Sequence, residues 1–155
     1  MSEAVAFPSL AWFSRLAELM NQNRVRQIQL GYVDCVARFT VLKGGRDGQD
    51  WSADVTFEEF GVTDVRKPRP GESARADFAL EADLASWRAM IESIAAGGGR
   101  PDLEQTLNRL SHTGTPMTVR SDDVLRSDLY FRFNQSLQEF VNASAQLATA
   151  FPTRP

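Results

Sequence analysis

The sequence predicts a single domain that combines strands with helices, in which at least one helix folds back over a sheet. The main evidence is a change of period within one segment. From Ala76 to Ala82, apolar residues alternate with mostly acidic ones, which is typical of a half-buried strand. From Leu84 to Ile94, apolar residues recur every three or four positions, as on one face of a helix. The 155 residues are enough to bury a core of ordinary size.

Two more strands are predicted on either side of a glycine-rich turn. Apolar and polar residues alternate over residues 32–42 and again over about 50–58. Between them lies Gly44–Gly48, where glycines accept the positive φ angles of a tight turn. A third short strand is expected after Gly61, at about 62–66. These segments predict a hairpin followed by an adjoining strand.

The remaining strands are expected at about 74–82 and 116–121, separated by helical segments. Ser9 is a normal helix cap, and Asp83 can cap the first free N–H groups of a later helix. Helices are expected at residues 9–22, 24–29, 83–96, 101–112 and 122–150. The last would carry an apolar stripe, interrupted by Ser144, on Leu125, Leu129, Phe133, Leu137, Phe140 and Leu147.

Composition excludes some partners and favours one compartment. The chain has 17 basic and 20 acidic residues, a net charge of −3. Because surfaces that bind nucleic acid normally show a basic excess, no nucleic-acid partner is expected. The single cysteine, Cys35, cannot form an internal disulfide and favours the reducing cytoplasm. Pro8 interrupts the apolar stretch Ala4–Phe13, so neither a signal peptide nor a membrane-spanning segment is expected.

The sequence shows no pattern of catalytic or metal-binding residues. His112 is the only histidine, and with the distant Cys35 it does not have the spacing of a zinc site. Asp77, Glu81 and Asp83 lie on the predicted solvent face of their strand, where solvated carboxylates make poor catalysts. We therefore expect no enzyme activity, no catalytic residues, no metal and no cofactor.

The run Leu129–Phe133 contains four large apolar residues within five positions. They cannot all lie on one face of a helix, so some must contact a neighbouring helix, another subunit or a ligand. The ten phenylalanines and three tryptophans of the chain leave a similar choice, because aromatic side chains fill cores and also line pockets for apolar ligands.

The order of these elements resembles the sterol carrier protein type-2 family. The best-matching residues of the strand-to-helix unit are Ala76, Asp77, Leu80 and Trp87. The stretches that match the later part of the family pattern are Gly99–Asp102, Gly114 and Met117–Asp122. The similarity spans Leu10–Phe133, and its motifs are degenerate patterns of apolar and small residues.

This resemblance implies an α+β fold in which a five-stranded sheet is covered on one face by helices. It also implies an apolar tunnel between sheet and helices that takes fatty acyl chains, sterols or other lipids without catalysis. The candidate ligand-binding residues are Phe39, Phe57, Phe78, Trp87, Met90, Ile91, Ile94, Met117 and Phe133. Each of them is equally suited to a plain core. The chain departs from the family in its glycine triplet, in the Asn108–Thr113 stretch and in its extended C-terminal helix.

Two functional hypotheses follow from the sequence. The first is a non-enzymatic protein of the cytoplasm that binds or transfers a hydrophobic small molecule, such as a lipid, fatty acyl chain, sterol or isoprenoid. The second is an interaction or accessory protein with a filled core. In that case the C-terminal helix, 122–150, would form a homodimer or dock on a partner enzyme. The same helix could also cap or block the tunnel.

Overall fold

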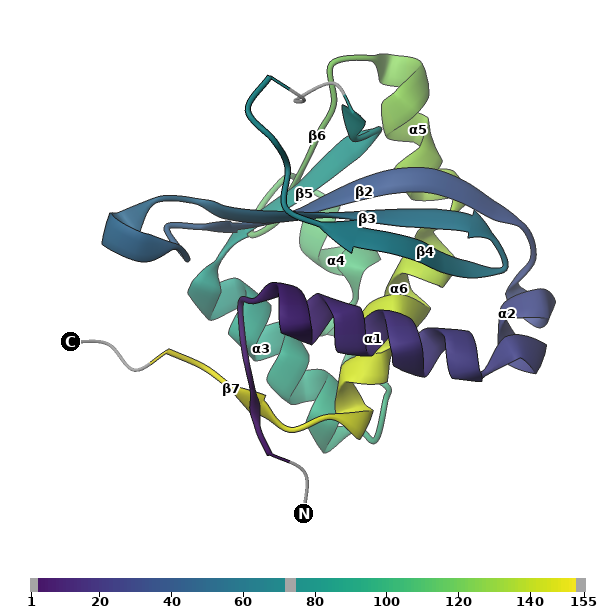
Figure 1. Cartoon of the computed structure of the whole chain (residues 1–155), viewed down its shortest axis with the longest axis horizontal. Helices are drawn as coiled ribbons and strands as arrows, with labels where there is room; N and C mark the ends of the chain where they lie inside the picture. Colours follow the sequence, from purple (N-terminus) through teal and green to yellow (C-terminus); the bar gives the residue numbers. More distant parts are fainter. Residues whose placement is uncertain (1–2, 72–74, 153–155) are drawn as a thin grey trace.

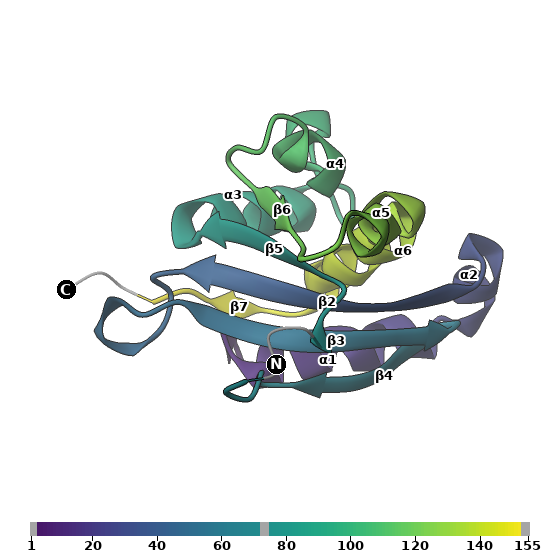
Figure 2. The ribbon, with the colours of Figure 1, turned by 90° about the horizontal axis from the view of Figure 1, so that it is seen from above.

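The computed structural model describes residues 3–71 and 75–152 and shows an α+β fold built on a five-stranded sheet (Figure 1). The strands lie in the order β4-β3-β2-β5-β6, which can be followed across the sheet in Figure 2. Their bounds are Val33–Leu42 for β2, Trp51–Glu59 for β3, Gly61–Arg66 for β4, Phe78–Asp83 for β5 and Thr118–Arg120 for β6. The predicted fold class is confirmed.

Strand β2 is the centre of the sheet. It pairs antiparallel with β3 and parallel with β5, while β4 adds to β3 and β6 adds to β5, both antiparallel. The turn between β2 and β3 holds the short 3-10 helix η1 (Arg46–Gly48), and Gly48 takes a φ of 71° there. The hairpin and the adjoining strand expected from the sequence are therefore present.

The helices α1 (Leu10–Gln22), α3 (Leu84–Ala96) and α6 (Asn134–Asn142) cover one face of the sheet (Figure 1). The caps expected at Ser9 and Asp83 form, because Ser9 Oγ accepts from Trp12 N at 3.1 Å and Asp83 Oδ1 accepts from Ser86 N at 2.8 Å. The other helical elements are α2 (Arg24–Leu30), η3 (Leu103–Gln105), α4 (Leu107–Ser111), α5 (Val124–Arg132) and η4 (Ala143–Gln146).

The prediction of a continuous helix over 122–150 was wrong. Helix α5 ends at Arg132, Phe133 leaves helical geometry with φ −106° and ψ 19°, and α6 then runs only to Asn142. An unbroken helix of that length would extend about 40 Å, comparable with the width of the domain. The break lets α5 pack on β5 and β6 while α6 packs on α1, α2 and α3.

The segment after α6 also differs from the predicted helix. After η4 the chain becomes extended and forms strand β7 (Thr149–Ala150), which pairs in parallel with β1 (Val5–Ala6). Val5 N donates to Ala148 O at 2.8 Å, and Phe7 N donates to Ala150 O at 2.8 Å. The second sheet therefore ties the first described residues of the chain to the last.

Two other boundaries need correction. The helix expected over 101–112 is divided into η3 and α4, because Thr106 is extended and caps α4 by accepting from Arg109 N at 3.2 Å. The strand expected over 74–82 begins at Phe78 among the described residues, while residue 74 lies outside them. The strand expected over 116–121 is the shorter β6.

A single apolar core lies between the sheet and its helices. The aromatic rings of three elements meet there, since Phe39 of β2 lies 5.3 Å from Phe13 of α1 and 5.6 Å from Phe140 of α6, centroid to centroid. Phe57 of β3 lies 5.3 Å from the same Phe140 ring. Burial of each such ring contributes about 2 to 3 kcal/mol, and this burial stabilises the packing of α1 and α6 on one face of the sheet.

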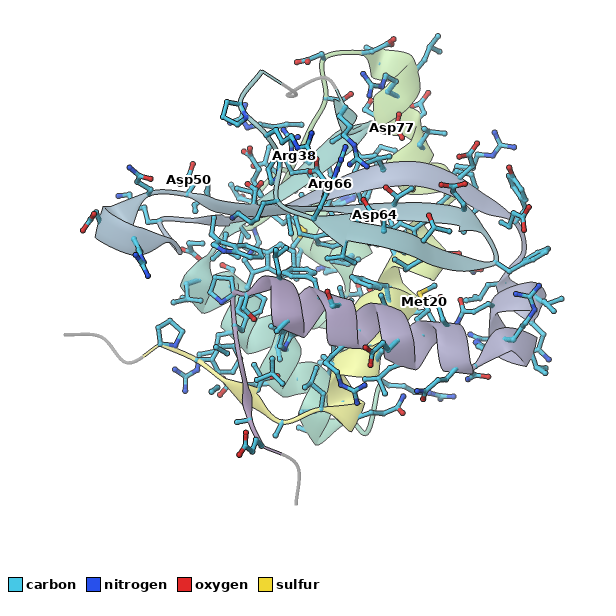
Figure 3. The ribbon with its side chains drawn as sticks, in the orientation of Figure 1. Met20, Arg38, Asp50, Asp64, Arg66 and Asp77 are labelled. Carbon is cyan, nitrogen blue, oxygen red and sulfur yellow. The ribbon has the colours of Figure 1, made fainter. Side chains whose placement is uncertain are left out.

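The opposite face of the sheet is polar, and a network of ion pairs crosses it (Figure 3). Asp54 of β3 is fully buried, and both of its carboxylate oxygens accept hydrogen bonds from Arg38 of β2, at 2.7 and 3.0 Å. Arg75 approaches the same carboxylate at 3.5 Å. Arg126 of α5 donates to Asp77 at 3.1 Å, so the network also fixes α5 against the sheet.

Candidate functional site

A groove of about 820 Å³ lies between helix α3 and the segment that follows α6. We call it the α3 groove. The residues that form its two walls belong to α3 and to the segment with strand β7, which lie on the helical side of the main sheet in Figure 1. Its lining is mostly apolar and consists of Leu84, Ala85, Arg88, Ile91, Glu92, Ala95, Ser144, Leu147, Ala148, Thr149, Phe151 and Pro152.

The helical wall follows from the spacing of residues in α3. Ala85, Arg88, Glu92 and Ala95 recur at three- and four-residue steps, so they form one stripe beside the buried stripe that contains Ile91. The alanines at both ends of the stripe have short side chains that do not fill the space beside the helix. The groove is therefore open where larger side chains would have filled it.

The second wall is an extended segment held by hydrogen bonds to the start of the chain. They include the backbone bonds donated by Val5 N and Phe7 N, and a side-chain bond in which Trp12 Nε1 of α1 donates to Thr149 Oγ1 at 2.9 Å. The Phe7 and Phe151 rings also meet, with centroids 5.9 Å apart. Contacts with residues far apart in the sequence thus keep this wall extended.

The charges of the groove are balanced. Arg88 Nε lies 3.3 Å from Glu92 Oε2, and the Arg88 guanidinium lies 4.9 Å from the centre of the Phe151 ring. Among the described residues, these two are the only charged side chains of the lining. The groove therefore offers an apolar surface with a neutral ion pair on its helical wall.

Comparison with known proteins rests on structure alone, since no family model and no curated sequence matches the chain. The crystal structure of sterol carrier protein 2 superposes with a TM-score of 0.63, covering 89% of this chain and 96% of the other at 16% identity. The chain has the sterol carrier protein 2 fold. The family resemblance seen in the sequence is thus confirmed for the fold.

A second solved structure agrees with this assignment. A conserved hypothetical protein from Thermus thermophilus, whose description relates it to sterol carrier proteins, superposes with a TM-score of 0.62 at 17% identity, covering 97% of each chain. The ubiquinone synthesis protein UbiJ-SCP2 reaches only 0.45 at 21% identity, covering 90% of this chain and 93% of the other, so we draw nothing from it. Identities this low establish the fold and no more.

Within this sterol carrier fold, the nine predicted ligand-binding residues all belong to the apolar core. Ile91 is the only one that also lines the α3 groove. The other eight, each at most 8% exposed, are Phe39, Phe57, Phe78, Trp87, Met90, Ile94, Met117 and Phe133. Neighbouring rings fill the space around several of them: Phe78, for example, lies 5.7 Å from Tyr130, centroid to centroid. The tunnel that they were expected to line stays a prediction.

Most of the groove lining was absent from the sequence-based list. The helix predicted over 122–150 includes most of Leu147–Pro152, and a helix there does not form this wall. Ala85 and Ala95 resemble ordinary residues of a solvated helix face. Two signals were available, since Pro152 cannot continue a helix and Thr149 favours extended backbone.

The remaining candidates for chemistry lie apart from the groove. His112 is exposed at the end of α4, and Cys35 is buried in β2. Among residues 3–71 and 75–152, no group of three or more His, Cys, Asp or Glu side chains could hold a metal ion. Across the same residues, no helix is both long and apolar enough to span a bilayer.

Cys35 gives a prediction about stability at high pH. Its burial, followed by the charges of Asp77 and Asp34, raises the pKa of Cys35 from 9.0 to about 12. The folded protein therefore keeps the proton that the unfolded chain releases above pH 9, and the free energy of unfolding should fall as the pH rises from 9 towards 12. Denaturant titrations of wild type and Cys35→Ala should show the stability of wild type relative to the variant declining over this window. A pH-independent difference would contradict it.

Proposed function

We propose that the chain binds a hydrophobic small molecule, such as a lipid, fatty acyl chain, sterol or isoprenoid, in the α3 groove. The observation that carries this proposal is the mostly apolar lining of a groove of about 820 Å³, a volume within the range of small-molecule sites. Burying about 300 Å² of apolar ligand surface at about 25 cal/mol per Å² provides roughly 7 kcal/mol before entropic losses.

The fold supports the same proposal, since the crystal structure that it resembles is named a sterol carrier protein. Ile91 connects the groove with the core, because its side chain lines the one and packs in the other. A long ligand could extend past Ile91 towards Met90 and Ile94 if these side chains moved apart. The tunnel implied by the family resemblance would then be a deeper continuation of the groove.

We further propose that the chain acts without catalysis, in the cytoplasm. The charged side chains of the groove, Arg88 and Glu92, neutralise each other, and Ser144 Oγ makes no hydrogen bond to a base among the described residues. These lining residues therefore do not provide the nucleophile–base pair that acyl transfer requires. The free, buried Cys35 suits a reducing compartment.

Filling the groove tests the proposal. Ala95 is an exposed residue of the helical wall, and Ala95→Trp places an indole ring in the groove without disturbing the core. We expect the variant to bind the methyl ester of a fluorescent long-chain fatty acid at least about tenfold more weakly than wild type, measured by titration, because the indole ring occupies apolar surface that the ligand would otherwise contact.

The matched control is Ala89→Trp, which changes an exposed alanine of the same helix outside the groove. It carries the same helix-propensity cost and should bind the probe as wild type does. Equal binding by wild type and by a folded Ala95→Trp variant would show that the ligand does not occupy the α3 groove.

An interaction function is the alternative, and two exposed aromatic residues favour it. Phe131 of α5 and Tyr32, just before β2, are 62% and 61% exposed and line a cavity of about 430 Å³. Large apolar side chains gathered at the surface often mark an interface. Native mass spectrometry separates the two functions, since a monomer carrying a small molecule supports the first and a bare dimer or hetero-complex supports the second.

A further inference from the structure

Ser144 is a buried polar residue in the mostly apolar wall of the α3 groove. It lies in η4, directly after α6, and is 1% exposed. Its Oγ has no hydrogen-bond partner among the residues that the structure describes. Because a buried hydroxyl without a partner costs free energy, an alanine at this position would be the more stable choice for a plain core.

The surroundings of Ser144 restrict what can pair with it. The lining around the groove is apolar except for Thr149, whose hydroxyl accepts from Trp12, and the Arg88–Glu92 pair. An ionised carboxylate in the groove would not find a free positive charge, because Arg88 is already paired with Glu92. Burying its charge would therefore cost free energy. An uncharged polar group costs far less to bury.

We propose that Ser144 determines the class of ligand, selecting amphiphiles whose single polar group is an uncharged hydroxyl or carbonyl. This inference rests on the proposed function of the α3 groove. The serine hydroxyl can donate to the carbonyl of an ester or ketone and can accept from an alcohol. Oγ is covered by its neighbours in the ligand-free protein, so the proposal requires a change between staggered χ1 positions that brings the hydroxyl to a bound ligand.

The test compares three ligands of equal chain length: 1-dodecanol, methyl dodecanoate and dodecanoate, each displacing a fluorescent probe at pH 8. We expect wild type to bind the alcohol and the ester about tenfold more tightly than the ionised acid. In Ser144→Ala, affinity for the two neutral ligands should fall about fivefold to tenfold, as expected for one buried hydrogen bond. Affinity for the acid should not change.

Two controls keep the test specific. Ser127→Ala makes the same chemical change on α5, outside the groove, and should preserve the wild-type order of affinities. Ser144→Ala should also raise the melting temperature of the ligand-free protein by about 2 °C, because it removes an unpaired buried hydroxyl. A merely structural role for Ser144 would alter the melting temperature and leave the ratio of affinities unchanged.

The outcomes separate the two proposals. If no ligand of the series binds to wild type, the proposed function of the groove fails. If the ligands bind, but dodecanoate binds most tightly or Ser144→Ala keeps the full preference for neutral ligands, the role of Ser144 is overturned while the groove retains its function. Loss of the preference in Ser144→Ala alone supports both.

Discussion

Replacing Trp87 with alanine is expected to lower the free energy of unfolding by about 3 to 5 kcal/mol, among the largest effects of any core substitution in this chain. The Trp87 side chain is almost completely buried, and its ring lies 6.1 Å from Phe39 and 6.4 Å from Phe7, centroid to centroid. Its removal opens a cavity between α3 and the sheet. Equilibrium unfolding in urea measures the loss.

The Trp87→Phe variant separates packing from hydrogen bonding. Trp87 Nε1 donates to the backbone carbonyl of Thr40 at 2.9 Å, and phenylalanine keeps much of the ring while losing this donor. We expect Trp87→Phe to lower the free energy of unfolding less than Trp87→Ala does. The difference between the two variants should be about 1 to 3 kcal/mol. A loss below about 1 kcal/mol in Trp87→Ala would mean that α3 does not depend on this contact.

Replacing Asp54, on the polar face of the sheet, with alanine should lower the free energy of unfolding by about 3 kcal/mol or more. The carboxylate is fully buried and receives two hydrogen bonds from Arg38, with Arg75 at 3.5 Å. Its removal takes away the buried charge that both guanidinium groups approach, although Arg75 keeps Asp64 at 3.4 Å. Asp54→Asn keeps the shape of the side chain, so its effect isolates the contribution of the charge.

An exposed ion pair provides the comparison. Arg15 and Glu18 form a salt bridge on α1, with side chains 43% and 60% exposed. We expect Glu18→Ala to change the free energy of unfolding by less than about 1 kcal/mol, because water screens both charges. Similar effects of Asp54→Ala and Glu18→Ala would show that the network across the sheet does not stabilise the fold.

The main sheet could be predicted because its signals are local. The alternation over 32–42 and 50–58 and the cap at Asp83 each depend on neighbouring residues, and each is present in the structure. The break at Phe133 could not be predicted in this way. The apolar stripe continues across it, and only the packing of α5 on β5 and β6 and of α6 on α1 decides that the helix must end there.

The groove was less predictable than the sheet for a related reason. Strand β7 has two residues, too few for an alternation, and its partner β1 lies at the other end of the chain. The predicted site residues were large and apolar, so they occupy the core. Of the predicted site residues, Ile91 alone lies in the core and also lines the groove. In the sequence, Ser144 stands out only because it interrupts an apolar stripe.

Because β1 pairs with β7, the first described residues of the chain hold one wall of the α3 groove in place. Two backbone hydrogen bonds at Val5 and Phe7 and one from Trp12 hold the extended wall against the rest of the molecule. A molecule leaving the groove past this wall would have to strain or break these bonds. Under the proposed function, substitutions in β1, whose side chains lie outside the described lining, should change the residence time of a bound ligand.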